Sequence, residues 1–305
     1  MSDAPWPALP YRDWEPTKQT VHRLTQIVGK VRMALVPFRN HWWHVTLYPS
    51  ATGLTTGLMP YGARSVQIDL DLVAHRLEVR TSDGGRAVVP LADGVCVADL
   101  YAGLFAALAE VDVAVTVDPR PFDLGGSPRL DEDRGHASYD ADAVTRWWTV
   151  LRRTEHVLLR FGAGFTGKAS PVHLFWHSFD LAHGRFSGRP AAPIPGADPV
   201  TAAAYSHEVV AVGWWPGDDR RTPFPAFYSY TAPEPAGLRD RPLRPAAAEW
   251  QDTGNGSMAI LPYDAVREAA DPEGDLLAFF ETAYAAGAEA AGWDRAALEA
   301  EPPLR

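Results

Sequence analysis

Apolar and polar side chains alternate without a break over residues 66–72, where Val66, Ile68, Leu70 and Leu72 are separated by Gln67, Asp69 and Asp71. Because successive side chains of a strand point to opposite faces, this spacing predicts a strand with one buried face and one face in water. Residues 75–80 are expected to return as its hairpin partner. A turn at Asp83-Gly84-Gly85 then leads to a short strand over residues 86–91. The alternation therefore limits this part of the chain to an antiparallel sheet.

Long segments with helical periodicity accompany these strands. Apolar residues recur at intervals of three and four over residues 17–35, 97–111, 140–161 and 271–284. Runs rich in β-branched and aromatic residues predict further strands at residues 41–48, 206–215, 226–231 and 258–261. Together these patterns predict an α+β fold, in which an antiparallel β-sheet carries long helices packed on one face.

The chain divides at a segment rich in proline, glycine and charge. Residues 119–139 combine prolines and glycines with the run Asp131-Glu132-Asp133-Arg134, which is typical of a linker. It separates an N-terminal half, residues 1–125, from a C-terminal half, residues 126–305, and we expect the two to share one core. Each half has a helix, then Gly-Lys, then Trp-His, then a short glycine-bounded segment, at spacings that differ by several residues. This echo leaves open whether the halves are pseudo-repeats.

Composition narrows the classes of partner. The net charge of −10 and the scattered basic residues argue against nucleic acid or an anionic membrane. The sequence has no apolar run of about 18 residues that would span a membrane. Cys96 is the only cysteine, so no disulfide forms within the chain, and the first residues lack the features of a signal peptide. We therefore expect a cytoplasmic protein whose partner is a small molecule.

Residues 171–189 concentrate titratable and aromatic side chains. The stretch contains three histidines, one aspartate, two arginines and three large rings: His173, His177, His183, Asp180, Arg185, Arg189, Phe175, Trp176 and Phe179. The aromatic content and Pro171 at its start favour a strand and loop over a helix. On a strand, His173 and His177 would lie about 13 Å apart, from a rise of roughly 3.3 Å per residue, so this pair alone should not chelate one metal. We expect the stretch to line a pocket.

A metal site would need ligands from several strands. Zinc takes three or four convergent ligands, and the candidates on aromatic-rich strands are His44, His173 and His207. The alternative is that each is an ordinary hydrogen-bonded histidine. The sequence therefore leaves a divalent metal cofactor open.

Residues 162–168, Gly-Ala-Gly-Phe-Thr-Gly-Lys, match the glycine-rich patterns of nucleotide-binding loops. That mechanism requires a strand before the glycines and a helix after them, so that the helix N-terminus faces the phosphate. Here the predicted order is reversed, and Ala169 stands where a phosphate loop has serine or threonine. A helix C-terminal cap explains the segment better, and we expect it to bind no nucleotide phosphate.

Basic and aromatic residues near the same stretch suggest ligand contacts. Arg185, Arg189 and Lys168 bracket it, and arginines can hold a carboxylate or phosphate through two parallel hydrogen bonds. The alternative is that these cations pair with the acidic excess of the chain. The sequence has 11 tryptophans, and rings such as Trp43 and Trp176 on several predicted strands favour an aromatic-walled ligand pocket.

Eight motifs carry a resemblance over nearly the whole chain. They are LPYRDWEPTKQTVHRLTQ (9–26), VGKV (28–31), HVTLY (44–48), GLTT (53–56), GKASPVH (167–173), SFDL (178–181), RFSGR (185–189) and YSHEV (205–209). Together they resemble a family of uncharacterised, mostly bacterial proteins defined only as a domain of unknown function. The resemblance implies one shared architecture and no established activity. It also implies glycine in many members at the position of His177, which makes His177 a weaker candidate than the titratable residues inside the motifs.

The leading hypothesis is an enzyme that acts on a small anionic molecule by acid–base chemistry. The acid–base group, its orienting carboxylate and the anion contacts would be His173 or His207, Asp180 or Glu208, and Arg185 with Arg189. One alternative is a non-catalytic protein that binds a small ligand in the same pocket. Another is a metal-dependent hydrolase or oxygenase that uses His44, His173 and His207. Whether the chain is an enzyme is thus left open by its sequence.

Overall fold

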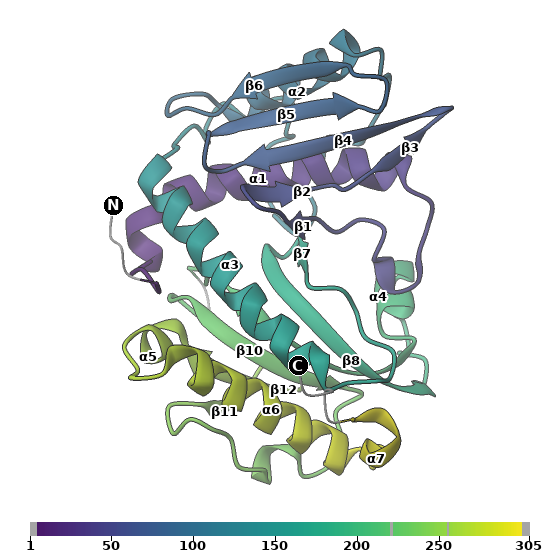
Figure 1. Ribbon diagram of the computed structural model, residues 1–305, viewed down its shortest axis with the longest axis vertical. Helices are drawn as coiled ribbons and strands as arrows, with labels where there is room; N and C mark the ends of the chain where they lie inside the picture. The colour runs from purple at the N-terminus through teal and green to yellow at the C-terminus, as the bar shows by residue number, and fades with distance from the viewer. Residues whose placement is uncertain (1–4, 220–221, 255, 301–305) are drawn as a thin grey trace.

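The structure is a computed structural model that describes residues 5–219, 222–254 and 256–300. Its strands form two six-stranded antiparallel sheets, drawn one above the other in Figure 1. The first contains β1 (Tyr48–Pro49), β2 (Gly53–Thr55), β3 (Met59–Tyr61), β4 (Arg64–Asp71), β5 (Arg76–Thr81) and β6 (Arg86–Pro90). The second contains β7 (His173–Phe175), β8 (Asp180–Pro190), β9 (His207–Trp215), β10 (Ala226–Ala232), β11 (Glu249–Asp252) and β12 (Ser257–Pro262). The predicted α+β fold is confirmed, and the alternating segment forms β4.

Four long helices cover the sheets. They are α1 (Tyr11–Leu35), α2 (Val97–Glu110), α3 (Ala141–Ala163) and α6 (Pro272–Ala290); the short ones are α4 (Pro199–Ala204), α5 (Tyr263–Arg267), α7 (Arg295–Leu298) and the 3₁₀ turns η1 (Asn40–Trp42) and η2 (Leu238–Asp240). α1 and α2 pack beside the first sheet, and α3 and α6 pack together on one face of the second (Figure 1). α3 ends at Ala163 with Gly164 as its cap, so the predicted order of helix, glycine loop and strand is confirmed.

The two sheets meet edge to edge. Leu47 and Leu174 exchange backbone hydrogen bonds of 3.0 and 2.8 Å, which places β1 beside β7. Outward from this contact the strand order is β1-β2-β4-β5-β6 in the first sheet, with β3 paired to β4, and β7-β8-β9-β10-β12-β11 in the second. The Trp-His pairs of the sequence echo do not occupy matching places, because one precedes β1 and the other follows β7. The boundary at residues 125 and 126 and a duplication both stay predictions.

Trp176 joins the halves through α1. The indole packs on Gly29 so closely that a Cβ at this glycine would lie 2.1 Å from the ring. The indole Nε1 donates to the Val45 carbonyl oxygen at 2.7 Å. Since Trp176 is only 3% exposed, this contact makes it a core residue, and its predicted part in ligand binding has no support from its position.

Two predicted strands need correction. Residues 41–48 do not form a strand, because His41 and Trp42 adopt positive φ angles of 56° and 60°, and only Tyr48 pairs in a sheet strand. Residues 171–189 form a hairpin rather than one strand. The chain reverses at Phe179, whose φ is 61°, and Phe175 of β7 lies opposite Asp180 of β8. His177 is therefore in the turn, and the expected spacing from His173 along one strand does not apply.

Candidate small-molecule site

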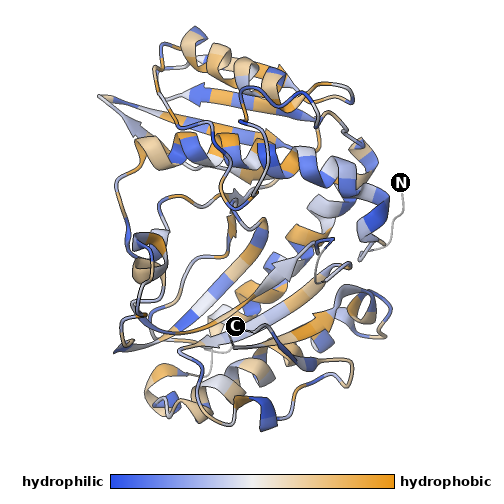
Figure 2. Ribbon diagram, turned by 180° about the vertical axis from the view of Figure 1, so that it is seen from behind, coloured by the Kyte–Doolittle hydropathy of each residue, from blue (hydrophilic) through white to orange (hydrophobic). Residues whose placement is uncertain are grey.

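A cavity of about 570 Å³ lies against the face of the second sheet opposite α3 and α6. This face is turned toward the viewer in Figure 2. The β7–β8 turn, α4, residues 41–43 and Phe122 from the first half complete its walls. A volume of this size is typical of sites for small organic ligands.

Small residues make the floor of the cavity. Ala182 and Gly184 of β8 and Ala211 of β9 carry little or no side chain, and this leaves room above the sheet. Large rings stand around this floor: Trp43, Phe175, Phe186, Tyr228 and Tyr230. The cavity therefore suits a molecule with an apolar, flat body.

A carboxylate stands at one end of the cavity. Asp180 is 9% exposed, and the hydroxyls of Ser178 and Tyr228 each donate to one of its oxygens. No arginine or lysine of the described chain forms a salt bridge with it. Burial, and then the negative charge of Asp180, raise the pKa of the Tyr228 hydroxyl well above its ordinary value, so Tyr228 stays a hydrogen-bond donor.

A row of hydroxyls continues from this end. The rings of Tyr228 and Tyr230 stack with centroids 6.2 Å apart and planes only 12° from parallel. The hydroxyls of Tyr230 and Tyr205 are 3.2 Å apart, and Tyr205 immediately follows α4. The row runs along an otherwise apolar wall and offers a ligand several places for a hydrogen bond.

A second polar group lies where β8 carries Phe186. His41 Nδ1 donates to the Ala204 carbonyl oxygen at 2.9 Å, which leaves Nε2 to face the Lys168 ammonium at 2.6 Å. The Lys168 Nζ lies 5.0 Å from the ring centre of Phe186 and 5.5 Å from that of Trp43. Burial against these rings lowers the pKa of Lys168, because the ammonium loses hydration.

His173 faces the cavity from β7. It is 1% exposed, its ring packs on Phe175 with centroids 4.6 Å apart, and its Nδ1 has no hydrogen-bond partner among the described residues. Burial, and secondarily His183 and Arg32, lower the pKa of His173 to about 3. At neutral pH it is therefore an uncharged imidazole, which can exchange hydrogen bonds with a ligand but is a weak base.

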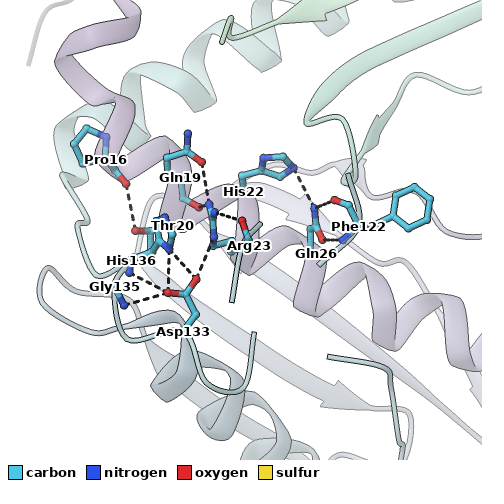
Figure 3. Close-up of polar contacts among 11 residues, drawn as sticks. Pro16, Gln19, Thr20, His22, Arg23, Gln26, Phe122, Asp133, Gly135 and His136 are labelled. Atoms are coloured by element: carbon cyan, nitrogen blue, oxygen red, sulfur yellow. Dashed lines mark hydrogen bonds and ion pairs between the residues drawn. The ribbon is translucent and has the colours of Figure 1, made fainter. Parts of the chain in front are cut away.

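α1 holds two wall segments of the cavity in place, and Figure 3 shows the contact to the first of them, Phe122. Gln26 bonds the backbone of Phe122 twice: its Oε1 accepts from the Phe122 N–H at 2.8 Å and its Nε2 donates to the Phe122 carbonyl at 2.9 Å. His22 Nε2 lies 3.1 Å from the carbonyl oxygen of His177, and its ring stacks on Phe179 at 4.7 Å. α1 thus positions one wall segment of its own half, Phe122, and one of the second half, the β7–β8 turn.

The same helix is tied to the linker by a buried ion pair. Asp133 is fully buried. Its carboxylate forms an ion pair with Arg23, whose Nε lies 3.1 Å away, and accepts from His136 Nδ1 at 2.8 Å and the backbone N–H of Gly135 at 3.1 Å (Figure 3). The predicted linker is therefore packed against α1.

The two arginines predicted to bind an anion instead make contacts with other residues of the protein. Arg185 is 2% exposed and points to the face covered by α3 and α6. There it donates to the Phe161 carbonyl, pairs with Glu281 at 3.4 Å and stacks between aromatic rings. Arg189 pairs with Glu208 at 2.7 Å and donates to the Ala291 carbonyl at 2.7 Å, at the C-terminus of α6. The two guanidinium groups do not converge, because Arg185 pairs with Glu281 within α6 whereas Arg189 lies at the C-terminal end of that helix. Glu208 is likewise occupied by Arg189 rather than by a histidine.

The three histidines predicted as metal ligands have different surroundings. His44 packs on Phe38 and Trp42, His173 on Trp43 and Phe175, and His207 on His41. Within residues 5–219, 222–254 and 256–300, no three histidine, cysteine, aspartate or glutamate side chains group so that they could hold a metal ion. The structure does not bring His44, His173 and His207 into one metal site.

Of the residues predicted for the site, the structure places Asp180, His173 and Trp43 on the cavity and Lys168 against its wall. Sequence reasoning missed Ser178 and His41. Tyr228 and Tyr230 were detectable as ligand contacts, because their spacing of two puts both on one face of β10. His41 gave no such signal, since its placement depends on a left-handed turn that local patterns do not reveal.

One comparison with known proteins identifies a relationship. The model of a family of unknown function (DUF5996) matches residues 6–300. Neither the comparison with curated proteins nor that with solved structures found a match. Within the described part of the chain, no helix is long and apolar enough to cross a membrane.

Proposed function

We propose that this chain, which belongs to the DUF5996 family of unknown function, is an enzyme that binds a small molecule in the aromatic cavity and uses Asp180 to transfer a proton. One observation carries the proposal: a buried carboxylate faces an apolar cavity and is held by two hydroxyls instead of a cation. A carboxylate that faces a cavity without a paired arginine or lysine is open to exchange a proton with a molecule bound there.

The neighbouring groups have complementary parts in this proposal. The Tyr228 hydroxyl, whose pKa is raised, keeps its proton and orients Asp180. His173 supplies an uncharged imidazole from the adjacent strand. The rings hold the apolar body of the substrate, and the Lys168 end receives its anionic or carbonyl group, in place of the two arginines that the sequence suggested. A cytoplasmic location remains part of the proposal, because Cys96 is a buried free thiol.

A non-catalytic ligand-binding protein is the second candidate. Both oxygens of Asp180 already accept a hydrogen bond from the protein, as expected for a carboxylate that only fixes the wall of a binding cavity. This candidate differs from the first in a measurable way, since it needs the cavity but no turnover.

The test uses a panel of small aromatic alcohols, ketones and carboxylates, observed by NMR in D₂O. Saturation transfer reports binding, and loss or deuteration of substrate signals reports turnover. An enzyme predicts that Asp180→Asn keeps binding and loses turnover by about 10²- to 10⁴-fold, the usual contribution of a general acid–base group. Glu249→Gln, at an exposed site on β11, is the control and should change neither.

The outcomes separate the two candidates. Binding without turnover of any panel member would favour the binding protein. The variant Ala211→Phe fills the cavity floor, so binding that survives this substitution would mean that ligands do not use the cavity, and both candidates would then fail.

A further inference from the structure

The charge that faces the cavity is negative. Three aspartates line it, and no lysine or arginine of the described chain does so. Asp180 is buried, whereas Asp123 and Asp198 are exposed. The lining also includes four histidines: His41, His173, His177 and His183. Burial lowers the pKa of each of them, so at neutral pH these imidazoles add no positive charge.

Aromatic rings surround the carboxylate of Asp180. Phe175 of β7 lies directly opposite it, so both side chains project from the same face of the sheet. On the other side, the antiparallel register of β8 and β9 brings Trp215 beside Asp180. The Tyr228 hydroxyl reaches the carboxylate from β10. Three rings from three strands therefore surround one negative charge.

This end of the cavity keeps free acceptors for hydrogen bonds. The oxygens of a carboxylate can accept about four hydrogen bonds, and the hydroxyls of Ser178 and Tyr228 use two of these places on Asp180. His173, which is 1% exposed, has no partner at Nδ1 within the described residues and lies on the same face as Phe175, two positions away. A ligand with N–H groups would therefore find acceptors here.

The surroundings favour an organic cation over a metal ion. The face of an aromatic ring attracts a cation, and a nearby carboxylate adds the opposite charge. A metal ion would need several ligands together, and no three histidine, cysteine, aspartate or glutamate side chains group in this way in the part of the chain that the structure describes. An ammonium group needs only one carboxylate and the rings around it.

We infer that the cavity takes a small protonated amine with an apolar body, and that its ammonium group donates to Asp180 between Phe175, Trp215 and Tyr228. This inference rests on the proposed function for the use of the cavity, and it names the substrate class. The Lys168 ammonium, 5.0 Å from the ring centre of Phe186, lies far from this position. Asp180 precedes Phe186 by six residues of β8, about 20 Å at a rise of roughly 3.3 Å per residue.

The test compares three ligands that share one aromatic ring and differ in charge. At pH 7 benzylamine is positive, benzyl alcohol is neutral and benzoate is negative. Titration of each ligand into the full chain, followed by saturation-transfer NMR, gives the dissociation constants. We expect benzylamine to bind at least about tenfold more tightly than either of the others, because it alone forms a close charge pair inside the cavity.

Two variants locate the preference. Asp180→Asn keeps the shape of the side chain and removes its charge, so benzylamine should bind at least about tenfold more weakly and benzyl alcohol as before. Phe175→Leu keeps an apolar wall without the ring, and we expect a loss of about twofold to tenfold for benzylamine alone. Glu249→Gln removes a charge outside the cavity wall and is the matched control, which should change neither affinity.

Benzylamine that binds no more tightly than benzyl alcohol, or does not bind at all, would overturn the inference. An unchanged preference for benzylamine in Asp180→Asn would overturn it as well, and an unchanged preference in Phe175→Leu would overturn the part given to the rings. Melting temperatures show whether the variants are folded, and Phe175→Leu still tests the site if Asp180→Asn is not.

The proposed function can fail separately. Preferred binding of benzylamine without turnover of any ligand would contradict the enzyme and leave the ligand class standing. Turnover of a neutral ligand that is lost in Asp180→Asn, with no preference for benzylamine, would contradict the ligand class and leave the enzyme standing.

Discussion

The hydroxyl of Tyr228 donates to the carboxylate of Asp180 across the backbone of Gly213. β9 lies between the two strands that carry these residues, so the tyrosine ring must lie flat over the middle strand. A Cβ at position 213 would be 2.5 Å from the Tyr228 hydroxyl oxygen and 2.3 Å from the Leu181 carbonyl oxygen. The contact between the two side chains therefore requires glycine at position 213.

Gly213→Ala should therefore displace Tyr228 and lower stability by about 1–3 kcal/mol, the usual cost of overpacking a tight site. Thermal and urea unfolding would measure this loss, and ultraviolet difference spectra would report the changed tyrosine environment. Gly162→Ala is the matched control, because its Cβ would meet only the His183 ring, at an ordinary 3.5 Å. Equal stability of both variants would contradict the contact.

Arg185→Lys should lower stability without lowering affinity for a cavity ligand. A lysine cannot reproduce the flat guanidinium stacked 3.5 Å from the Phe161 ring centre and 4.3 Å from that of Tyr284. We expect a loss of about 2–4 kcal/mol, as for other disrupted buried charge networks. Arg189→Lys, which is half exposed, should cost only about 0.5–1 kcal/mol.

The affinity of both variants for a ligand from the NMR panel shows whether these arginines only stabilise the fold or also bind the ligand. Weaker binding by Arg185→Lys at unchanged melting temperature would restore the anion contact that the sequence suggested.

The arginines mark the limit of what the sequence could predict. The alternation over residues 66–72 and the helical periodicities gave the fold class and the elements, because both patterns depend on local spacing. The direction of a side chain depends on strand register, however. Asp180 and Arg185 lie on one strand and differ by an odd number of positions, so they face opposite sides of the sheet. Which face each side chain points to depends on where the turn ends and the strand begins. The chain reversal at Phe179 that sets this boundary could not be recognised from the sequence.

The cavity was predictable in outline only. Its aromatic walls and Asp180 were expected from the crowded stretch at residues 171–189. Its floor depends on glycine and alanine meeting across β8 and β9, and its second wall on Phe122, which Gln26 fixes from another part of the chain. Such long-range pairings are set by tertiary packing and cannot be obtained from local patterns.

Acid should unfold this protein through buried histidines as well as carboxylates. Burial lowers the pKa of His173 and His22 to about 3 and that of His183 to about 4, below the ordinary value near 6.5. The unfolded chain therefore binds more protons, and stability falls as pH drops from about 6.5 toward these values. Between neutral pH and pH 5, His173 and His22 should each lower the free energy of unfolding by about 2 kcal/mol.

The measurement is the melting temperature from pH 8 to pH 4.5 in constant ionic strength. His173→Gln should flatten the decline between pH 6.5 and 5, whereas His156→Gln, at an exposed position of α3, should leave it unchanged. Identical slopes for His173→Gln and wild type would show that His173 accepts a proton in the folded state.

Gln26 should control the cavity from a distance. Its amide pairs with the Phe122 backbone through one donated and one accepted bond, much as a neighbouring strand would (Figure 3). Gln26→Leu keeps the volume but removes both bonds, and leaves a Phe122 segment with unmatched backbone groups. We expect about 1–2 kcal/mol lower stability and faster ligand dissociation, with the chemical step at Asp180 unaffected.

Gln26→Glu retains the acceptor for the Phe122 N–H and loses only the donor, so its dissociation rate should lie between those of wild type and Gln26→Leu. Stopped-flow measurement with a fluorescent panel ligand gives these rates directly. Three equal dissociation rates would mean that Phe122 does not retain the ligand, and the other walls of the cavity would then hold it.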